Sequence, residues 1–364
     1  MSFFQNHSGW PLVPLKNIAT LKRGYDLPVG ARNEGAVPIY AANGKNGAHD
    51  EVKIKGPGVI TGRSGTIGKV HYCEEGFWPL NTALYVMDFH GNHPRWVYYM
   101  LSAFKLERFS EGAGVPTLNR NLVHDELIPL PPLSEQKRIA AILDKVDAIR
   151  RKRQQAIQLA DDFLRAVFLD MFGDPVSNPK GWEVKPLGSL VVNKDGKRIP
   201  IKASDRADMA GEYPYYGASG VIDYVNDFIF EGRHLLIGED GANLLARSTP
   251  IAFIADGRYW VNNHAHVLGE KNGLSLDYLA FSINMRGLES FVSGSAQPKL
   301  NQENLNKIPI QVPPLILVDK FSAILNECQE YMGKMIISEP EFLFGSLSQK
   351  AFSGQLVARK SPCV

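Results

Sequence analysis

Apolar residues recur every three or four positions between residues 139 and 167, interrupted only at Arg153, which is the spacing of a coiled-coil seam. The positions are Ile139, Ile142, Val146, Ile149, Ala156, Ala160, Phe163 and Val167. Ser134 stands before them as a candidate N-cap, and Gly173 followed by Pro175 ends the pattern. We therefore expect a central spacer helix over residues 134–173, a rod of roughly 60 Å.

A second pattern with this spacing occupies the end of the chain, at Phe321, Ile324, Cys328, Tyr331, Met335 and Phe342. It lacks a serine at the position of Ser134, and Pro340 must kink or restart the helix near Ser338. We expect a C-terminal spacer helix over residues 316–356, kinked near Pro340, and a tail at 357–364. Each helix is too long to be covered by its own small domain, so the two are expected to pair.

The helices belong to an internal repeat that takes up half of the chain. PPLSEQKRIAAIL at 131–143 returns as PPLILVDKFSAIL at 313–325, and WPLVPL at 10–15 returns as WEVKPL at 182–187. Between them PIYAANG, GPGVITGRSGTIG, NTA and GAGVPTLN return in the same order as PYYGASG, GRHLLIGEDGANL, NHA and GSAQPKLN. Several matches in one order indicate two structurally similar halves.

Each half also contains short apolar runs of strand length, at 58–61, 84–87, 234–237 and 251–254. The expected fold class is α+β. Two similar globular α/β domains, at 1–133 and 174–315, are separated by two long helices that pair as an antiparallel coiled coil. The whole has a pseudo-twofold internal repeat.

Composition narrows the class of protein further. A chain of 364 residues with 44% apolar and 21% charged residues is typical of a globular protein with two domains. No apolar run reaches 18 residues and the N-terminus lacks a signal-peptide pattern, so no membrane association is expected. An odd number of scattered cysteines, Cys73, Cys328 and Cys363, favours reduced thiols in the cytoplasm. A net charge of +2 is too small for tight nucleic-acid binding by phosphate neutralisation alone.

No set of residues with catalytic spacing is apparent. The loop from Gly62 to Gly68 lacks the Lys-Ser/Thr ending of a P-loop. Glu51 with Lys53, and Glu183 with Lys185, match half of a restriction-nuclease site without the Pro-Asp half. His71 with Cys73, and His264 with His266, lack a third metal ligand. We therefore expect no catalytic residues and no metal site in this chain.

Gly-rich loops at matching positions of both halves instead carry side chains that can read DNA bases. The candidates in the first half are Asn43, Lys45, Asn46, Arg63, Ser64, Thr66, Lys69, Asn81 and Arg120. Those in the second half are Glu239, Asp240, Asn243, Arg247, Asn263, His264 and Lys299. For any single residue, a solvated turn explains the pattern equally well. The matching positions of the loops in both halves favour DNA reading by these residues as a group.

The chain resembles the specificity (S) subunits of Type I restriction–modification enzymes. The resemblance rests on both PPL…AIL junctions, VITGRSGTIGKV, RYWVNNHAHVL at 258–268 and AFSGQL at 351–356. It implies a non-catalytic subunit whose two target-recognition domains each read one part of an interrupted site in double-stranded DNA. It also implies that the helices dock two methyltransferase subunits. The residues expected for pairing and docking are Ile139, Ile142, Val146, Ile149, Phe163, Phe321, Ile324, Tyr331 and Met335.

The resemblance further implies that this chain binds no cofactor. S-adenosylmethionine for adenine methylation belongs to the methyltransferase, and ATP and Mg to a motor-nuclease (restriction) subunit, whose presence the sequence leaves open. Two alternatives also stay open. One is an S-like scaffold in another methyltransferase-linked phage-defence complex, and the other is a self-contained DNA-modifying enzyme using Glu51/Lys53 or His264/His266.

Overall fold

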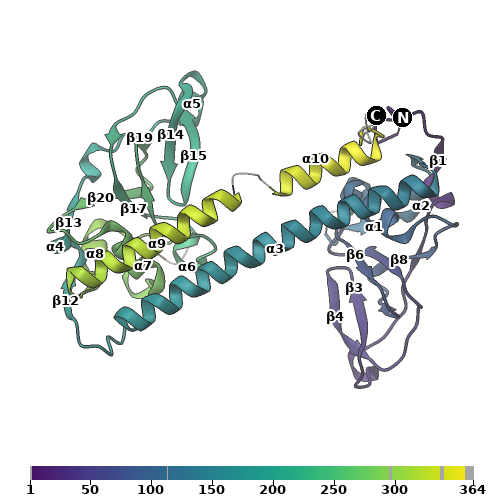
Figure 1. The fold of residues 1–364 in the computed structure, drawn as a ribbon, viewed down its shortest axis with the longest axis horizontal. Coiled ribbons are helices and arrows are strands. Elements are labelled where there is room, and N and C mark those ends of the chain that lie inside the picture. Colours follow the sequence, from purple (N-terminus) through teal and green to yellow (C-terminus); the bar gives the residue numbers. More distant parts are fainter. Residues whose placement is uncertain (1, 113, 295–296, 337–339, 357–364) are drawn as a thin grey trace, which may run out of the picture. The chain divides into compact units, whose positions relative to one another are not determined.

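The computed structural model describes residues 2–112, 114–294, 297–336 and 340–356. The chain divides into two compact units (Figure 1). Unit 1 comprises Met1–Gln154 and Ile336–Val364, and unit 2 comprises Gln155–Met335. The side chains of Met335 and Phe342, the residue Cys363 and the expected tail at 357–364 lie outside the described residues. Among the described residues, none of the helices has the length and apolar content needed to cross a bilayer.

Unit 1 is built on a four-stranded antiparallel sheet in the order β2-β8-β5-β6. Its strands are β2 (Thr20–Arg23), β5 (Gly58–Gly62), β6 (Val70–Cys73) and β8 (Ala83–Asp88). A three-stranded sheet, β4-β3-β7, contains β3 (Val37–Ala41), β4 (Gly44–His49) and β7 (Trp78–Pro79). Two short pairs complete the unit: β1 (Leu12–Pro14) with β11 (Leu127–Pro129), and β9 (Ser110–Glu111) with β10 (Thr117–Leu118). Its globular domain also contains the helices α1 (Pro94–Ala103) and α2 (Arg120–His124).

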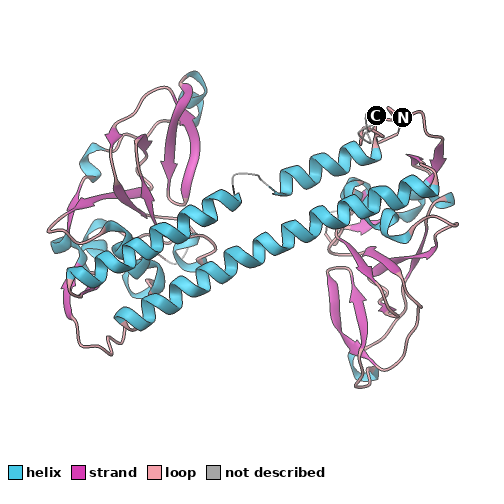
Figure 2. Ribbon diagram, viewed as in Figure 1, coloured by secondary structure: helices cyan, strands magenta, loops and turns pink. Residues whose placement is uncertain are grey.

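Unit 2 repeats this topology almost strand for strand. Its antiparallel sheet has the order β13-β20-β17-β18, with β13 (Val191–Asn193), β17 (His234–Gly238), β18 (Ala252–Ala255) and β20 (Ala265–Glu270). The second sheet is β15-β14-β19-β16, from β14 (Ala210–Gly217), β15 (Gly220–Val225), β16 (Phe230–Glu231) and β19 (Arg258–Val261). The terminal pair is β12 (Glu183–Pro186) with β21 (Pro309–Val312), and the helices are α4 (Leu187–Leu190), α5 (Ala203–Asp208), α6 (Asn243–Ala246), α7 (Leu276–Met285) and α8 (Gln302–Lys307). The predicted α+β internal repeat is thus confirmed (Figure 2).

The central helix α3 spans Leu133–Phe172. It begins one residue earlier than expected, because the amide N of Gln136 donates to the carbonyl O of Pro132 (3.0 Å). Ser134 therefore lies in the first turn, and the prediction that it caps the helix is wrong. Pro131 precedes another proline, which keeps it out of the helical conformation and fixes the start at this point. The end is as expected: Gly173 has φ +79° and its amide N donates to the carbonyl O of Leu169 (2.9 Å).

The buried stripe of α3 differs from the predicted seam. Ile139 is fully buried as expected, but Ile149 and Phe163 are 53% and 51% exposed. The residues buried with Ile139 are Ala140 and Leu143 in unit 1, and the helix buries Leu164, Phe168 and Phe172 in unit 2. The helix packs mainly on its own globular domains, so each domain's position selects the buried face. Spacing along one helix cannot reveal that position.

The C-terminal helical region consists of α9 (Leu315–Ile336) and α10 (Pro340–Phe352), so the predicted restart at Pro340 is confirmed. Within unit 2, the buried Phe321 of α9 lies against Phe168 and Phe172, with ring centroids 5.5 Å apart in both cases. The start of α9 thus meets the end of α3, and these segments run antiparallel (Figure 1). Ile324 is partly buried beside them, whereas Tyr331 is 60% exposed.

Within unit 1, α10 packs on the globular domain together with the N-terminal segment. The Phe352 ring lies 5.3 Å from that of Phe4 and 6.1 Å from that of Trp96. The amide N of His7 donates to the carbonyl O of Ser353 (2.9 Å). The first and last described segments of the chain therefore meet in one core.

Candidate nucleic-acid interface

Three segments of unit 1 that are distant in sequence meet at one edge of the four-stranded sheet. They are the end of β5 with the loop that follows it (residues 62–65), the segment that leads into β8 (81–83) and the segment around β10 (116–119). The amide N of Arg63 donates to the carbonyl O of Thr82 (2.8 Å), and the amide N of Leu118 donates to the carbonyl O of Arg63 (2.8 Å). The amide N of Gly65 donates to the carbonyl O of Pro116 (2.9 Å), and Ser64 forms a β-bridge with Thr117.

Unit 2 builds the same junction from its own copies of these segments, 238–241, 263–265 and 298–301. The amide N of Glu239 donates to the carbonyl O of His264 (2.8 Å), and the amide N of Leu300 donates to the carbonyl O of Glu239 (2.7 Å). The amide N of Gly241 donates to the carbonyl O of Pro298 (3.1 Å), and Asp240 forms a β-bridge with Lys299. We call this arrangement the three-segment junction of each unit.

Glycine is required at the turn of both junctions. Gly65 has φ +88° and Gly241 has φ +104°, a backbone conformation that other residues rarely adopt. The glycine at the start of each loop is needed for close packing: a Cβ on Gly62 would overlap the carbonyl O of Thr66, and one on Gly238 would overlap that of Ala218. Both loops are therefore held in one fixed backbone path.

The side chains of the unit 1 junction are one arginine and several hydroxyl and amide groups. The Nε of Arg63 donates to the carbonyl O of Asn81 (2.8 Å), and the rest of the guanidinium has no hydrogen bond to the described residues. Asn81 Nδ2 donates to the carboxylate of Asp26. Thr117 is exposed and Thr82 is partly exposed. Asn119 accepts a hydrogen bond from the amide of Asn121 and so caps α2.

The unit 2 junction carries several charges instead. Glu239, with a side chain only 12% exposed, accepts from Arg198 (2.7 Å) and forms an ion pair with Lys299 (3.2 Å). Asp240 pairs with the Nδ1 of His264 (2.8 Å). Beneath them, the ring of the buried His266 contacts Asp195 Oδ2 (2.6 Å) and the carbonyl O of Leu300 (2.8 Å).

Two carboxylates of this network, those of Asp195 and Glu239, have pKa values that their neighbours lower. Burial would raise the pKa of Glu239, but hydrogen bonds from Arg198 and Lys299 hold it below its ordinary value. Burial would likewise raise the pKa of Asp195, and hydrogen bonds from His266 and the Val267 amide bring it below its ordinary value. The junction of unit 2 is therefore a fixed ionic network.

The family model of the Type I restriction modification DNA specificity domain (Methylase_S) matches residues 7–159 and 179–350. The chain belongs to this family. It contains two specificity domains, and each match includes one three-segment junction.

Individual relatives agree with this assignment. The chain is 35% identical over 144 residues to a candidate type I restriction enzyme specificity subunit of Haemophilus influenzae, covering 40% of this chain and 36% of the relative. It is 27% identical over 214 residues to the EcoprrI specificity subunit of Escherichia coli, covering 56% of this chain and 52% of the relative. The alignments thus span no more than about half of these relatives.

The fold is shared with a solved structure, that of a Type I restriction-modification system S subunit from M. genitalium. The TM-score is 0.69 with 16% sequence identity, over 96% of this chain and 97% of the other. At that identity the similarity establishes the common fold.

The junctions of the two specificity domains contain half of the DNA-binding residues predicted from the sequence. These are Arg63, Ser64, Asn81, Glu239, Asp240, Asn263, His264 and Lys299. Asn263 is exposed beside His264. Their role in DNA binding stays a prediction.

The other predicted residues of the first specificity domain lie around the junction or away from it. Asn43 is exposed in the turn between β3 and β4, and Lys45 and Asn46 are exposed on β4, where Asn46 accepts from Arg32 (2.9 and 3.1 Å). Thr66 and Lys69 follow the junction loop, and the carbonyl O of Lys69 accepts from Thr61 (2.8 Å). Arg120 begins α2.

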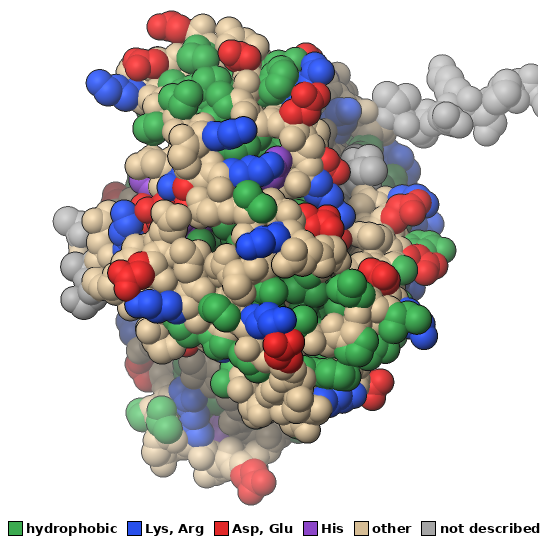
Figure 3. Space-filling view, turned by 90° about the vertical axis from the view of Figure 1, so that its left-hand side faces the viewer, with side chains coloured by type: hydrophobic (Ala, Val, Ile, Leu, Met, Phe, Trp, Pro, Cys, Tyr) green, Lys and Arg blue, Asp and Glu red, His purple; other side chains and the backbone are tan. Residues whose placement is uncertain are grey.

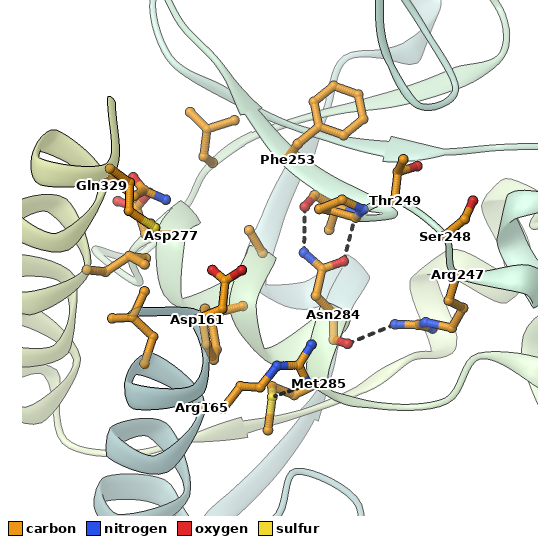
Figure 4. Close-up of a pocket in the computed structure, with 18 residues that line it drawn as sticks. Asp161, Arg165, Arg247, Ser248, Thr249, Phe253, Asp277, Asn284, Met285 and Gln329 are labelled. Atoms are coloured by element: carbon orange, nitrogen blue, oxygen red, sulfur yellow. Dashed lines mark hydrogen bonds between the residues drawn. The ribbon is translucent and has the colours of Figure 1, made fainter. Parts of the chain in front are cut away.

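Two predicted residues of the second domain lie away from the junction. Asn243 begins α6 and folds back on its own loop, accepting from the amide of Thr249 (3.1 Å). Arg247 donates to the carbonyl O of Asn284 (2.9 Å) at the end of α7, and Asn284 donates in turn to the carbonyl O of Ala252 (2.6 Å) (Figure 4). Arg247 thereby lines a cavity of about 700 Å³ together with residues of α3, α7 and α9.

Sequence reasoning missed Thr82, Thr117 and Arg198. Thr82 and Thr117 occupy the positions equivalent to His264 and Lys299 in the aligned repeat blocks NTA/NHA and PTLN/PKLN. The sequence repeat therefore contained the information needed to find them. Arg198 lies outside every repeat block. Only the fold brings it to Glu239.

Proposed function

We propose that this chain is the DNA-recognition subunit of a Type I restriction–modification system, with each specificity domain reading one part of an interrupted site. The observation that carries the proposal is the three-segment junction, which occurs once in each domain with the same backbone and different side chains. Arginine, asparagine, lysine and carboxylate groups are those that distinguish base pairs in the DNA major groove. Two copies with different side chains suit two different half-sites.

Basic and acidic side chains are interspersed on the face of the molecule shown in Figure 3. With a net charge of +2, phosphate neutralisation by this chain alone gives little affinity. We propose that partner subunits supply the remaining phosphate contacts. Base contacts from the junctions then supply the selectivity.

The helices offer surfaces for such partners. On α3, Ile149, Leu159 and Phe163 are 53%, 60% and 51% exposed, and Tyr331 of α9 is 60% exposed. Exposed large apolar side chains on long helices favour helix-mediated docking. We propose that two methyltransferase subunits dock here, bind S-adenosylmethionine and methylate adenine, and that this chain is not catalytic. ATP and Mg then belong to a motor-nuclease subunit.

The experiment is to map adenine methylation by single-molecule sequencing in cells that express the chain with its cognate methyltransferase. Matched cells lack this chain alone. We expect one interrupted motif, methylated on both strands only when the chain is present. In a second strain, Arg63→Ala should weaken recognition of one half-site only.

The chain and the methyltransferase could form a stable complex when both are present, and yet methylation could be the same in cells that lack the chain. That result would contradict DNA recognition and favour a scaffold. Methylation by the purified chain alone, supplied with S-adenosylmethionine and Mg²⁺, would contradict the non-catalytic assignment.

A further inference from the structure

The two three-segment junctions share every residue that their backbone requires. The aligned segments are Gly-x-x-Gly at 62–65 and 238–241, Asn-x-Ala at 81–83 and 263–265, and Pro-x-Leu-Asn at 116–119 and 298–301. The shared glycines make the turn, the shared leucines are buried, and the shared final asparagines cap α2 and α8. Only the positions marked x differ between the two junctions.

The differing positions are Arg63, Ser64, Thr82 and Thr117 in unit 1, and Glu239, Asp240, His264 and Lys299 in unit 2. Backbone hydrogen bonds and β-bridges join these positions to one another in each unit, as described above. They therefore form one cluster in each unit, although up to 60 residues of sequence separate its members. The clusters of the two units thus have different side chains and the same backbone hydrogen bonds.

We propose that four matched positions determine which bases each specificity domain recognises in its half-site. The matched pairs are Arg63/Glu239, Ser64/Asp240, Thr82/His264 and Thr117/Lys299. The inference rests on the proposed function and assigns its specificity to named residues. A reading surface needs a rigid backbone beneath exchangeable side chains, because base contacts depend on placement to a fraction of an ångström. The shared glycines, prolines and caps supply that rigidity.

The two clusters differ in the groups that they can offer. Unit 1 combines one guanidinium with three hydroxyl groups, which suits a guanine contact supported by adaptable donors and acceptors. In unit 2 the Glu239 carboxylate is occupied by Arg198 and Lys299, so we assign it to positioning Lys299, whose side chain is 52% exposed. The Asp240–His264 pair, 24% and 49% exposed, presents the other polar groups.

The test exchanges side chains between the clusters and reads the methylated motif. Arg63→Glu, Ser64→Asp, Thr82→His and Thr117→Lys are combined in the full chain, expressed with the cognate methyltransferase. We expect the half of the motif read by unit 1 to change and the other half to remain. Methylation of the original motif should fall by about 5- to 160-fold for each base that the variant no longer recognises.

Smaller variants guard against misfolding of the fourfold variant. Asp240→Ser with His264→Thr, and Lys299→Thr alone, alter exposed or half-exposed groups of unit 2 and should change only the other half of the motif. Lys307→Thr is the matched control, because Lys307 is exposed on α8 and its ion pair is with Glu303 (2.5 Å) on the same helix. It should leave the motif unchanged.

An unchanged motif in the folded variants, judged by complex formation and melting temperature, would refute the assignment while leaving the proposed function intact. If the unaltered chain directs no motif at all, the proposed function itself fails. A change in both halves from one variant would refute the assignment of one cluster to each half-site.

Discussion

Replacing Phe168 by Ala is expected to destabilise unit 2 and leave unit 1 unchanged. The Phe168 ring is fully buried, and its centroid lies 5.1–5.9 Å from the rings of Phe172, Tyr278, Phe281 and Phe321. These rings come from α3, α7 and α9, so the truncation opens a cavity where three helices meet. Large-to-small changes of this kind cost about 3–5 kcal/mol in the free energy of unfolding.

Phe163→Ala is the matched control. Phe163 lies about one and a half turns earlier on the same helix, but its side chain is 51% exposed. Its truncation should change the free energy of unfolding by about 0.5 kcal/mol or less. If methyltransferase subunits dock on α3, the Phe163→Ala variant should bind them more weakly although its own stability is unchanged.

The assay is hydrogen exchange followed by mass spectrometry, which resolves the two units by their peptides. In the Phe168→Ala variant, amides of β17 and β20 that exchange only by opening of the whole unit should exchange roughly a hundred-fold faster or more. Peptides of β5 and β8 in unit 1 should be unaffected. Equal effects of both substitutions, or equal acceleration in both units, would refute the assignment of Phe168 to a unit 2 core.

Three further predictions concern other contacts within the two units. Phe352→Ala should lower the free energy of unfolding of unit 1 by about 3–5 kcal/mol and leave unit 2 unchanged, because this ring is buried against Phe4. Hydrogen exchange of the β5 amides measures the effect, and unchanged protection of these amides would contradict the prediction. Asn301→Ala removes the side chain that caps α8 and should lower unit 2 stability by about 0.5–2 kcal/mol in denaturant unfolding, whereas no change would show that the cap contributes nothing. The pKa values of Asp195 and Glu239 are held below their ordinary values, so the stabilisation they provide is present above the ordinary carboxyl range and is lost as the pH falls through the folded-state values. Unit 2 should therefore lose stability on acidification, and Glu239→Gln should flatten that dependence; an identical pH profile in the variant would contradict the network.

Much of the fold could be predicted from the sequence, because each half of the repeat gives an independent prediction of the same elements. Strands at 58–61 and 234–237 were expected in equivalent places and lie in equivalent strands of the two antiparallel sheets. The helix end at Gly173 and the restart at Pro340 were also predicted correctly, since glycine and proline restrict the backbone locally. The start at Leu133 was missed, because Pro131 and Pro132 determine it and Ser134 does not.

The candidate site was predictable only in part. Matched Gly-rich loops pointed to Arg63, Glu239 and six other residues of the junctions, and missed Thr82 and Thr117. The same composition also pointed to Arg247, which instead lies against the end of α7. A loop's composition shows which groups it can offer, but the direction in which each group points depends on packing by distant elements.

By itself the sequence determined the duplication, the helices and the residues that turn or cap the backbone, because these depend on local conformation and short-range periodicity. Tertiary structure decided which face of α3 is buried, that the end of the chain joins the core of unit 1, and which loops meet in each junction. Those outcomes depend on contacts between residues far apart in sequence. Arg198 reaches Glu239 from 41 positions away, and no pattern along the chain records that contact.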